Sequence, residues 1–241
     1  MMDLKGKTAI ISGGGRGIGK VIALDLAREG CNIAVSSRNE SELNEVVKEA
    51  EAIGVSALGL QLDLSEEQNV TDLVDRIIDR FNSVDILINN AGIILPRPFL
   101  EVSLEEWDKT MNINLRAAFI LSQKVLNIMK EKRSGYIINI SSTVALSVPS
   151  HLASYGASKC GMVGLSQALY ETAKEFCVKV STIYPGITDT KMVRDLNPSH
   201  SKPGQWMLPE DISYCVMFLL KQSNRMIVKD IVPWSTGYDK I

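Results

Sequence analysis

The chain has 241 residues, with 26 Lys and Arg against 28 Asp and Glu for a formal net charge of −2, and 45% of its residues are hydrophobic. This length and composition predict one folded domain with a sizeable core. A weakly acidic chain lacks the broad positive field that binds phosphate backbones, so nucleic acid and anionic membranes are disfavoured as main partners and a small ligand is favoured.

Metal-ligating residues are too few and too scattered to predict a metal site or a disulfide framework, which favours a reducing compartment. The opening residues are too polar for a secretory signal, and no apolar stretch approaches the roughly 18 residues that span a membrane, so we expect a cytoplasmic protein. The residues concerned are Cys31, Cys160, Cys177, Cys215, His151 and His200.

Short apolar runs rich in β-forming residues alternate with longer amphipathic segments along the whole chain. The predicted strands are 8–11, 33–35, 55–62, 84–88, 136–140, 178–183 and 226–232, and the longest predicted helices are 104–130 and 155–176. This alternation predicts an α/β fold in which about seven parallel strands are covered by helices on both faces. The Pro- and Gly-containing segment 190–207 interrupts the rhythm, and we interpret it as a substrate flap before a helix that starts near Pro209.

The first predicted strand ends in the letters S-G-G-G-R-G-I-G, from Ser12 to Gly19, and runs directly into a helical pattern. Glycines allow a tight turn and let backbone N–H groups approach a pyrophosphate, while the helix start adds partial positive charge. The turn therefore predicts a nucleotide site. Because the strict G-x-G-x-x-G spacing is not met, a glycine-rich connection without a ligand remains the alternative.

This turn resembles the T-G-x-x-x-G-I-G turn of the short-chain dehydrogenase/reductases, with serine replacing threonine. The letters N-N-A-G that begin at Asn89 resemble a second family motif, and Asp63 resembles the acidic residue near the adenine. An ordinary turn and a helix cap are the respective alternatives. The resemblance implies a Rossmann-type doubly wound fold over residues 1–241 as a single domain. It also implies cofactor contacts from Ser12, Gly13, Gly15, Arg16, Gly17, Ile18, Gly19, Asp63, Leu64, Asn90, Ala91 and Gly92.

The end of the second predicted strand favours NADP(H) over NAD(H). NAD-selective sites usually carry an acidic residue there, which binds the ribose and repels a 2′-phosphate. Here the position is the neutral Ser37, and Arg38 follows with a guanidinium suited to a phosphate. Arg16 resembles the second basic residue of NADP-preferring members. The alternative is a pair of solvated surface arginines.

A Tyr-x-x-x-Lys spacing occurs at Tyr155 and Lys159 and again at Tyr170 and Lys174, but only Tyr155 has a serine, Ser142, thirteen residues before it. Residues four apart share one helix face, so the ammonium can lie near the phenol. A free phenol has a pKa of roughly 10. We expect the Lys159 charge and the positive charge of an oxidised nicotinamide to favour phenolate and to suit Tyr155 to acid/base work.

The family resemblance extends this pair to a catalytic tetrad of Asn114, Ser142, Tyr155 and Lys159. Asn114 would kink its helix and hold a water in the proton relay, although neighbouring Asn112 leaves the choice open. The family's P-G-x-x-x-T motif, otherwise a common turn, adds cofactor contacts from Pro185, Gly186, Thr188 and Thr190, together with Ser37, Arg38, Tyr155 and Lys159. Six motifs in family order imply hydride transfer between NADP(H) and a carbonyl or secondary alcohol.

Within the family, the chain is most similar to 3-oxoacyl-acyl-carrier-protein reductases. Arg133 matches a basic residue that those enzymes present to the carrier, but Phe176 replaces the second one, which puts carrier docking in doubt. Apolar residues on several faces of 104–130 and 155–176 favour a homotetramer. The expected substrate pocket is mostly apolar and comprises Ile94, Val144, His151, Tyr184 and Met192.

Three other classes of function compete with this interpretation. A non-catalytic NADP-binding regulator would use the same fold for protein contacts, but it would not need the complete tetrad. A Rossmann-like methyltransferase would also use a glycine turn, yet it would leave Tyr155, Lys159 and Asn90 unexplained. A Ser-His-Asp hydrolase is disfavoured because no G-x-S-x-G motif occurs.

Overall fold

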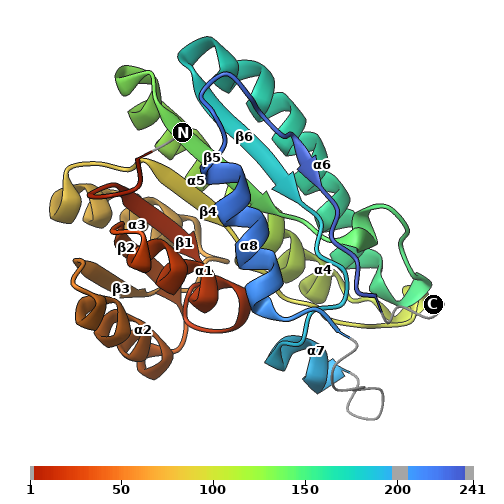
Figure 1. Ribbon diagram of the computed structural model, residues 1–241. Helices are drawn as coiled ribbons and strands as arrows, with labels where there is room; N and C mark the ends of the chain where they lie inside the picture. Colours follow the sequence, from red (N-terminus) through yellow and green to blue (C-terminus); the bar gives the residue numbers. More distant parts are fainter. Residues whose placement is uncertain (1–2, 197–205, 237–241) are drawn as a thin grey trace.

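Parallel strands form the central sheet of the computed structural model, which describes residues 3–196 and 206–236 (Figure 1). Within these residues the strand order is β3-β2-β1-β4-β5-β6-β7, and every neighbouring pair is parallel. The strands are β1 (Thr8–Ser12), β2 (Asn32–Ser37), β3 (Ala57–Gln61), β4 (Ile86–Asn89), β5 (Gly135–Ile140), β6 (Val178–Ile183) and β7 (Asp230–Ile231). The predicted fold class is confirmed.

Helices cover both faces of the sheet (Figure 1). One core cluster joins α1, α2 and α8 to the sheet, and a second joins α3, α5 and the end of α6 to its other face. Because both faces are covered, β1, β4 and β5 are buried along their whole length. The helices are α1 (Gly17–Arg28), α2 (Glu40–Ile53), α3 (Glu67–Phe81), α4 (Leu104–Met111), α5 (Ala117–Lys132), α6 (Ala153–Ala173), α7 (Lys191–Leu196) and α8 (Pro209–Leu220).

Local sequence signals set several helix ends. The side chain of Asn39 accepts hydrogen bonds from the backbone N–H groups of Ser41 and Glu42 and so caps the start of α2. Gly54 ends that helix at a φ of 104°, a left-handed conformation that glycine adopts without strain. At α8, Pro209 occupies the first turn, as the sequence predicts.

The order of the strands indicates where on the sheet a ligand is expected to bind. The chain builds β2 and β3 on one side of β1 and then crosses to β4 on the other side. Ligands of doubly wound sheets bind where the order reverses, outside the carboxyl ends of the strands. The residues after β1 and β4 therefore meet at one edge of the sheet, next to those after β5 and β6.

Two predicted elements differ from the structure. The helix predicted over 104–130 is divided into α4 and α5 by a π-helical turn, Asn112–Arg116. The strand predicted over 226–232 is reduced to Asp230–Ile231, although backbone N–H groups of and after β6 also donate to the carbonyls of Lys229 and Pro233. Within the predicted flap, residues 191–196 form α7, and residues 197–205 lie outside the described part of the chain.

None of the helices in the described ranges is long and apolar enough to cross a lipid bilayer.

Candidate active site

A cavity of about 650 Å³ runs along the carboxyl edge of the sheet, from the glycine turn after β1 to Tyr155 on α6. Its size is typical of small-molecule and cofactor sites. Most of the site residues predicted from the sequence line it: Gly13, Gly15, Arg16, Gly17, Ile18, Ser37, Arg38, Asp63, Leu64, Asn90, Ala91, Gly92, Ser142, Tyr155, Lys159, Pro185, Gly186, Thr188 and Thr190, with Ile94, Val144, His151 and Met192.

The glycine turn is packed too closely to accept side chains at several of its positions. A Cβ on Gly13 would lie 2.9 Å from the Cα of Ala91, and a Cβ on Gly19 would lie 2.3 Å from the carbonyl oxygen of Gly13. Gly13 also has a φ of 67°, in the left-handed region. Gly19 is therefore not part of the cavity lining. Its lack of a side chain lets the first turn of α1 pack against the carbonyl of Gly13.

Hydrogen bonds tie the turn to the residues after β4. The Ser12 hydroxyl accepts from the backbone N–H groups of Asn90 and Ala91 at 3.0 and 3.1 Å. The amide nitrogen of Asn90 donates to the carbonyl oxygens of Ser12 and Gly13 at 3.0 and 3.1 Å. Ser12 thus supports the wall from below and is not part of the lining.

Asn114 lies within the π-helical turn and is fully buried. Its side-chain oxygen accepts from the backbone N–H of Ile93 at 2.8 Å, and its nitrogen donates to the Ile93 carbonyl and the Ser158 hydroxyl, both at 3.0 Å. The side chain therefore clamps the segment after β4 to α6. Asn114 does not line the cavity, and its proposed role in a proton relay stays a prediction.

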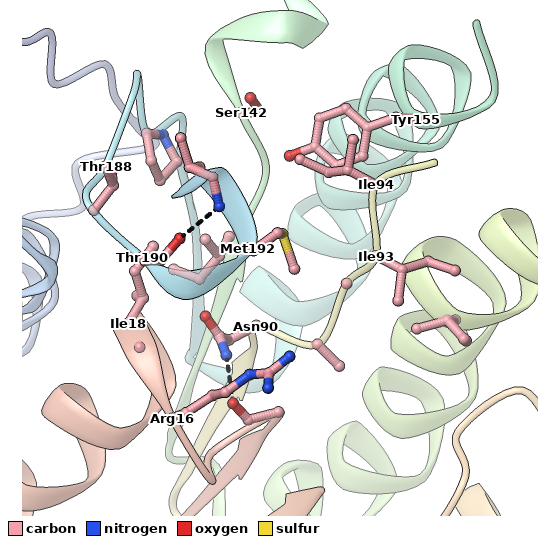
Figure 2. Close-up of a pocket in the computed structure, with 18 of the residues that line it drawn as sticks. Arg16, Ile18, Asn90, Ile93, Ile94, Ser142, Tyr155, Thr188, Thr190 and Met192 are labelled. Atoms are coloured by element: carbon pink, nitrogen blue, oxygen red, sulfur yellow. Dashed lines mark hydrogen bonds between the residues drawn. The ribbon is translucent and has the colours of Figure 1, made fainter. Parts of the chain in front are cut away.

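Ser142 follows β5, and Tyr155 and Lys159 lie one turn apart on α6. Figure 2 shows the phenol of Tyr155 directed toward the strand end that carries Ser142. Lys159 is buried, its Nζ donates to the carbonyl of Ile140 at 2.8 Å, and Nζ lies 5.7 Å from the centroid of the Tyr155 ring. The three groups of the predicted constellation therefore converge at one end of the cavity.

Burial dominates the electrostatics of this end. It raises the pKa of Tyr155, and a hydrogen bond with Ser142 opposes that rise without reversing it. It also lowers the pKa of Lys159 to about 8. The net pKa shift of Tyr155 among the protein's own groups is therefore upward, because the desolvation of the phenol is the larger effect. The lowering that we expect from Lys159 together with an oxidised nicotinamide stays a prediction.

The other end of the cavity lies beside β2, where Ser37, Arg38 and Arg16 all face it. Arg16 Nη1 lies 3.3 Å from Glu42 Oε1, so this arginine is ion-paired with a carboxylate that the sequence analysis did not single out. Asp63 accepts from the backbone N–H and hydroxyl of Ser65 at 2.9 and 2.8 Å. Burial opposes its ionisation, but these bonds and nearby Arg38 hold the pKa of Asp63 below its ordinary value.

The segment after β6 forms one wall of the cavity. Figure 2 shows Thr188 and Thr190 across the opening from Ile93 and Ile94. The Thr190 hydroxyl accepts from the backbone N–H of Val193 at 3.4 Å and so joins this wall to α7. Further lining residues that sequence patterns did not reveal are Ser36, Asn39, Glu42, Leu62, Ile113, Ile140, Ser141, Thr143, Pro149, Leu152, Ile187, Lys191 and Val193.

One predicted pocket residue does not line the cavity. Tyr184 is buried, and its hydroxyl donates to Asp230 Oδ1 at 2.8 Å, which ties β6 to the edge strand β7. The prediction that Tyr184 lines the substrate pocket is therefore wrong. Its place after β6 in the sequence does not reveal whether the side chain points into the cavity or away from it. Across residues 3–196 and 206–236, no group of three His, Cys, Asp or Glu side chains is placed to hold a metal ion.

Comparison with known proteins agrees with this geometry. The family model for short chain dehydrogenases matches residues 7–201. The chain belongs to the short-chain dehydrogenase family. It is 33% identical to the 3-oxoacyl-acyl-carrier-protein reductase FabG of Vibrio cholerae over 90% of this chain and 91% of that protein. The predicted family is thus confirmed, and an oxidoreductase activity follows from it.

Two solved structures of the family differ in the cofactor that they contain. A metagenomic short-chain oxidoreductase in complex with NADP has a TM-score of 0.84 at 27% identity, over 96% of this chain and 97% of that one. NAD⁺-bound xylitol dehydrogenase has a TM-score of 0.85 at 25% identity, over 96% of this chain and 98% of that one. The choice between the two cofactors in this short-chain dehydrogenase therefore depends on its own residues.

Proposed function

We propose that this short-chain dehydrogenase transfers hydride between NADP(H) and a carbonyl or secondary alcohol, and that it acts as an NADPH-dependent ketone reductase. The observation that carries the proposal is the convergence of Ser142, Tyr155 and buried Lys159 at one end of a cavity whose other end presents Arg16 and Arg38. A binding-only regulator would not require a buried lysine beside a buried phenol.

The cavity has features that fit a dinucleotide. Gly17 and Ile18 open α1, where the first N–H groups have no partner within the helix, and both residues line the cavity. The buried hydroxyl of Ser36, also in the lining, has no hydrogen-bond partner within the described chain. Such groups would satisfy polar atoms of a bound nucleotide.

The choice of NADP(H) rests on charge. Arg16 and Arg38 would hold the 2′-phosphate, and the neutral Ser37 would not repel it, whereas an acidic residue at that position would.

The residues at the other end would handle the substrate oxygen and a proton. NADPH supplies the hydride when it is bound. Tyr155, whose pKa is raised, holds its proton at neutral pH and donates it from Oη to the carbonyl oxygen. Ser142 donates a hydrogen bond to the same oxygen and stabilises the developing negative charge. Lys159 positions α6 against β5 through its bond to Ile140, and its ammonium stabilises the phenolate that remains.

The substrate end favours an apolar ketone such as a 3-oxoacyl thioester. Ile94, Val144 and Met192 line it together with His151. Arg133, the residue that would contact an acyl carrier protein, is not required for this activity. The guanidinium of Arg133 donates to the carbonyl of Glu175 at 3.2 Å and lies 3.5 Å from Cys177 Sγ, so it is engaged within its own chain.

The decisive experiment follows the oxidation of NADPH with a panel of ketones, comprising 3-oxoacyl thioesters, diketones, sugars and steroid-like ketones. Turnover that requires both NADPH and one class of ketone would support the proposal and name the substrate class. Binding of S-adenosylmethionine in place of NADPH, with no turnover of any ketone, would overturn it.

A further inference from the structure

The ion pair between Arg16 and Glu42 lies inside the cavity and has no role in the proposal above. Glu42 is the third residue of α2, its side chain is 23% exposed, and its Oε1 lies 3.3 Å from Arg16 Nη1. Both residues line the end of the cavity beside β2. A Cβ on Gly15 would lie 3.3 Å from the Cβ of Glu42, so the stem of this side chain packs directly against the glycine turn.

A carboxylate at this place opposes a 2′-phosphate. The N–H groups that Arg16 directs at Glu42 are not free for a phosphate, so binding a phosphate at Arg16 requires this ion pair to open or places two anions side by side. Either event costs free energy. A ribose 2′-hydroxyl carries no charge and can donate a hydrogen bond to a carboxylate, so an unphosphorylated ribose meets no such cost.

We propose that Glu42 is a specificity-determining residue, which limits the preference of this enzyme for a 2′-phosphorylated cofactor by holding Arg16. The inference rests on the proposed function, because it assumes that the end of the cavity beside β2 takes the adenosine half of NADP(H). Through this ion pair the enzyme retains measurable use of NAD(H) despite the neutral Ser37 and the basic Arg38.

Glu42 also has a structural role that must be separated from this one. It lies in the first turn of α2, where acidic side chains interact favourably with the helix dipole, and its backbone N–H donates to the capping Asn39 side chain at 3.3 Å. Glu40 lies in the same first turn but does not line the cavity. Glu40→Gln therefore removes a charge at the helix start without removing the ion pair, and it is the matched control.

The test measures binding of adenosine 2′,5′-bisphosphate and adenosine 5′-monophosphate by calorimetry, because these probes differ only in the 2′-phosphate. We expect Glu42→Gln to increase the ratio of the two affinities by about fivefold in favour of the bisphosphate, as expected for release of one partly exposed ion pair. Glu40→Gln should leave the ratio unchanged. In an Arg16→Ala background, the effect of Glu42→Gln should shrink, because only the direct repulsion between Glu42 and the 2′-phosphate remains.

The outcomes separate this inference from the function on which it rests. If wild-type protein binds neither probe, the proposed cofactor site and this inference both fail. If it binds the bisphosphate but Glu42→Gln and Glu40→Gln give the same ratio, only the role of Glu42 fails. An effect of Glu42→Gln that persists at full size without the Arg16 side chain would also overturn the mechanism proposed here.

Discussion

At the scale of single residues, the two Tyr-x-x-x-Lys spacings have different surroundings. Tyr155 faces the cavity, whereas Tyr170 lies under Lys229, whose Nζ is 3.8 Å from the ring centroid. We expect Tyr155→Phe to lower kcat for ketone reduction by about 10²- to 10⁴-fold, because the proton donor is lost. Tyr170→Phe is the control and should keep wild-type kcat. Wild-type turnover by folded Tyr155→Phe, checked by its thermal transition, would exclude the phenol as the proton donor.

Lys159 links activity to stability. Its pKa is about 8 in the folded protein against an ordinary value of 10.5, so the unfolded chain binds the proton more tightly. The cost of holding a buried ammonium is therefore present below pH 8 and disappears as the pH rises toward 10.5.

Lys159→Met removes this cost. The change that it causes in the free energy of unfolding should therefore be more stabilising at pH 7 than at pH 9.5, by about 2 kcal/mol. Urea denaturation of both proteins at the two pH values measures the difference. The substitution should also abolish turnover. The same change in unfolding free energy at both pH values would show that Lys159 is not held with a lowered pKa.

Cofactor preference can be tested at the end of β2. Ser37→Asp combined with Arg38→Leu places a carboxylate where the ribose binds and removes a guanidinium that would hold the phosphate. We expect the ratio of kcat/KM for NADPH to that for NADH to fall by about 100-fold, since charge repulsion replaces a charge-assisted hydrogen bond. An unchanged ratio would mean that neither residue contacts the 2′-phosphate.

At the scale of helices and strands, the periodic patterns predict elements well and their exact extents poorly, and only the resemblance at Asn114 implies the kink that the π turn Asn112–Arg116 introduces. A π turn inserts one residue into a helix, so the apolar spacing over 104–130 still indicates one continuous helix. The apolar run 226–232 indicates a full strand, but only its end, from Lys229 to Pro233, accepts backbone hydrogen bonds from β6 and the residues after it. The motif residues at the ends of β1, β4 and β5 were predictable because parallel strands bring their carboxyl ends to one edge.

Other parts of the site were not predictable because they depend on packing between distant segments. Glu42 reaches the cavity only because α2 lies against the glycine turn, and Leu152 only because the loop before α6 folds over it. Tyr184 follows β6 as predicted but turns toward Asp230. Such directions depend on the neighbours that a side chain meets after the sheet has formed.

The tight contact between the turn and α1 gives an element-scale prediction. In Gly19→Ala the new Cβ would lie 2.3 Å from the Gly13 carbonyl, which is backbone and cannot move without displacing the turn. We expect a loss of about 1–3 kcal/mol in unfolding free energy, with strongly weakened binding of NADPH. Lys20→Ala is the control, because it removes only the ion pairs of Lys20 with Glu45 and Glu49. It should change the unfolding free energy and the affinity for NADPH little. Unaltered NADPH affinity in Gly19→Ala would contradict the assigned role of the turn.

At the scale of the whole molecule, the sheet is buried on both faces, yet large apolar side chains remain on the outer helices. Leu104 and Phe119 are 80% and 47% exposed on α4 and α5. On α6, Gly164 opens to empty space, so a neighbouring helix could approach its backbone closely. Exposed apolar surface of this kind is typical of interfaces between chains. We therefore propose that α4, α5 and α6 form a subunit interface of a homotetramer.

This assembly predicts a mass in solution of about 106 kDa, from four chains of 26.5 kDa each. Phe119→Asp should lower the mass measured by light scattering, because a carboxylate in a helix interface loses its hydration without gaining a partner. Ile53→Asp is the control, since Ile53 is 39% exposed at the end of α2 and belongs to none of these helices. A monomeric mass for the wild-type chain, or an unchanged mass for Phe119→Asp, would place any subunit contact elsewhere.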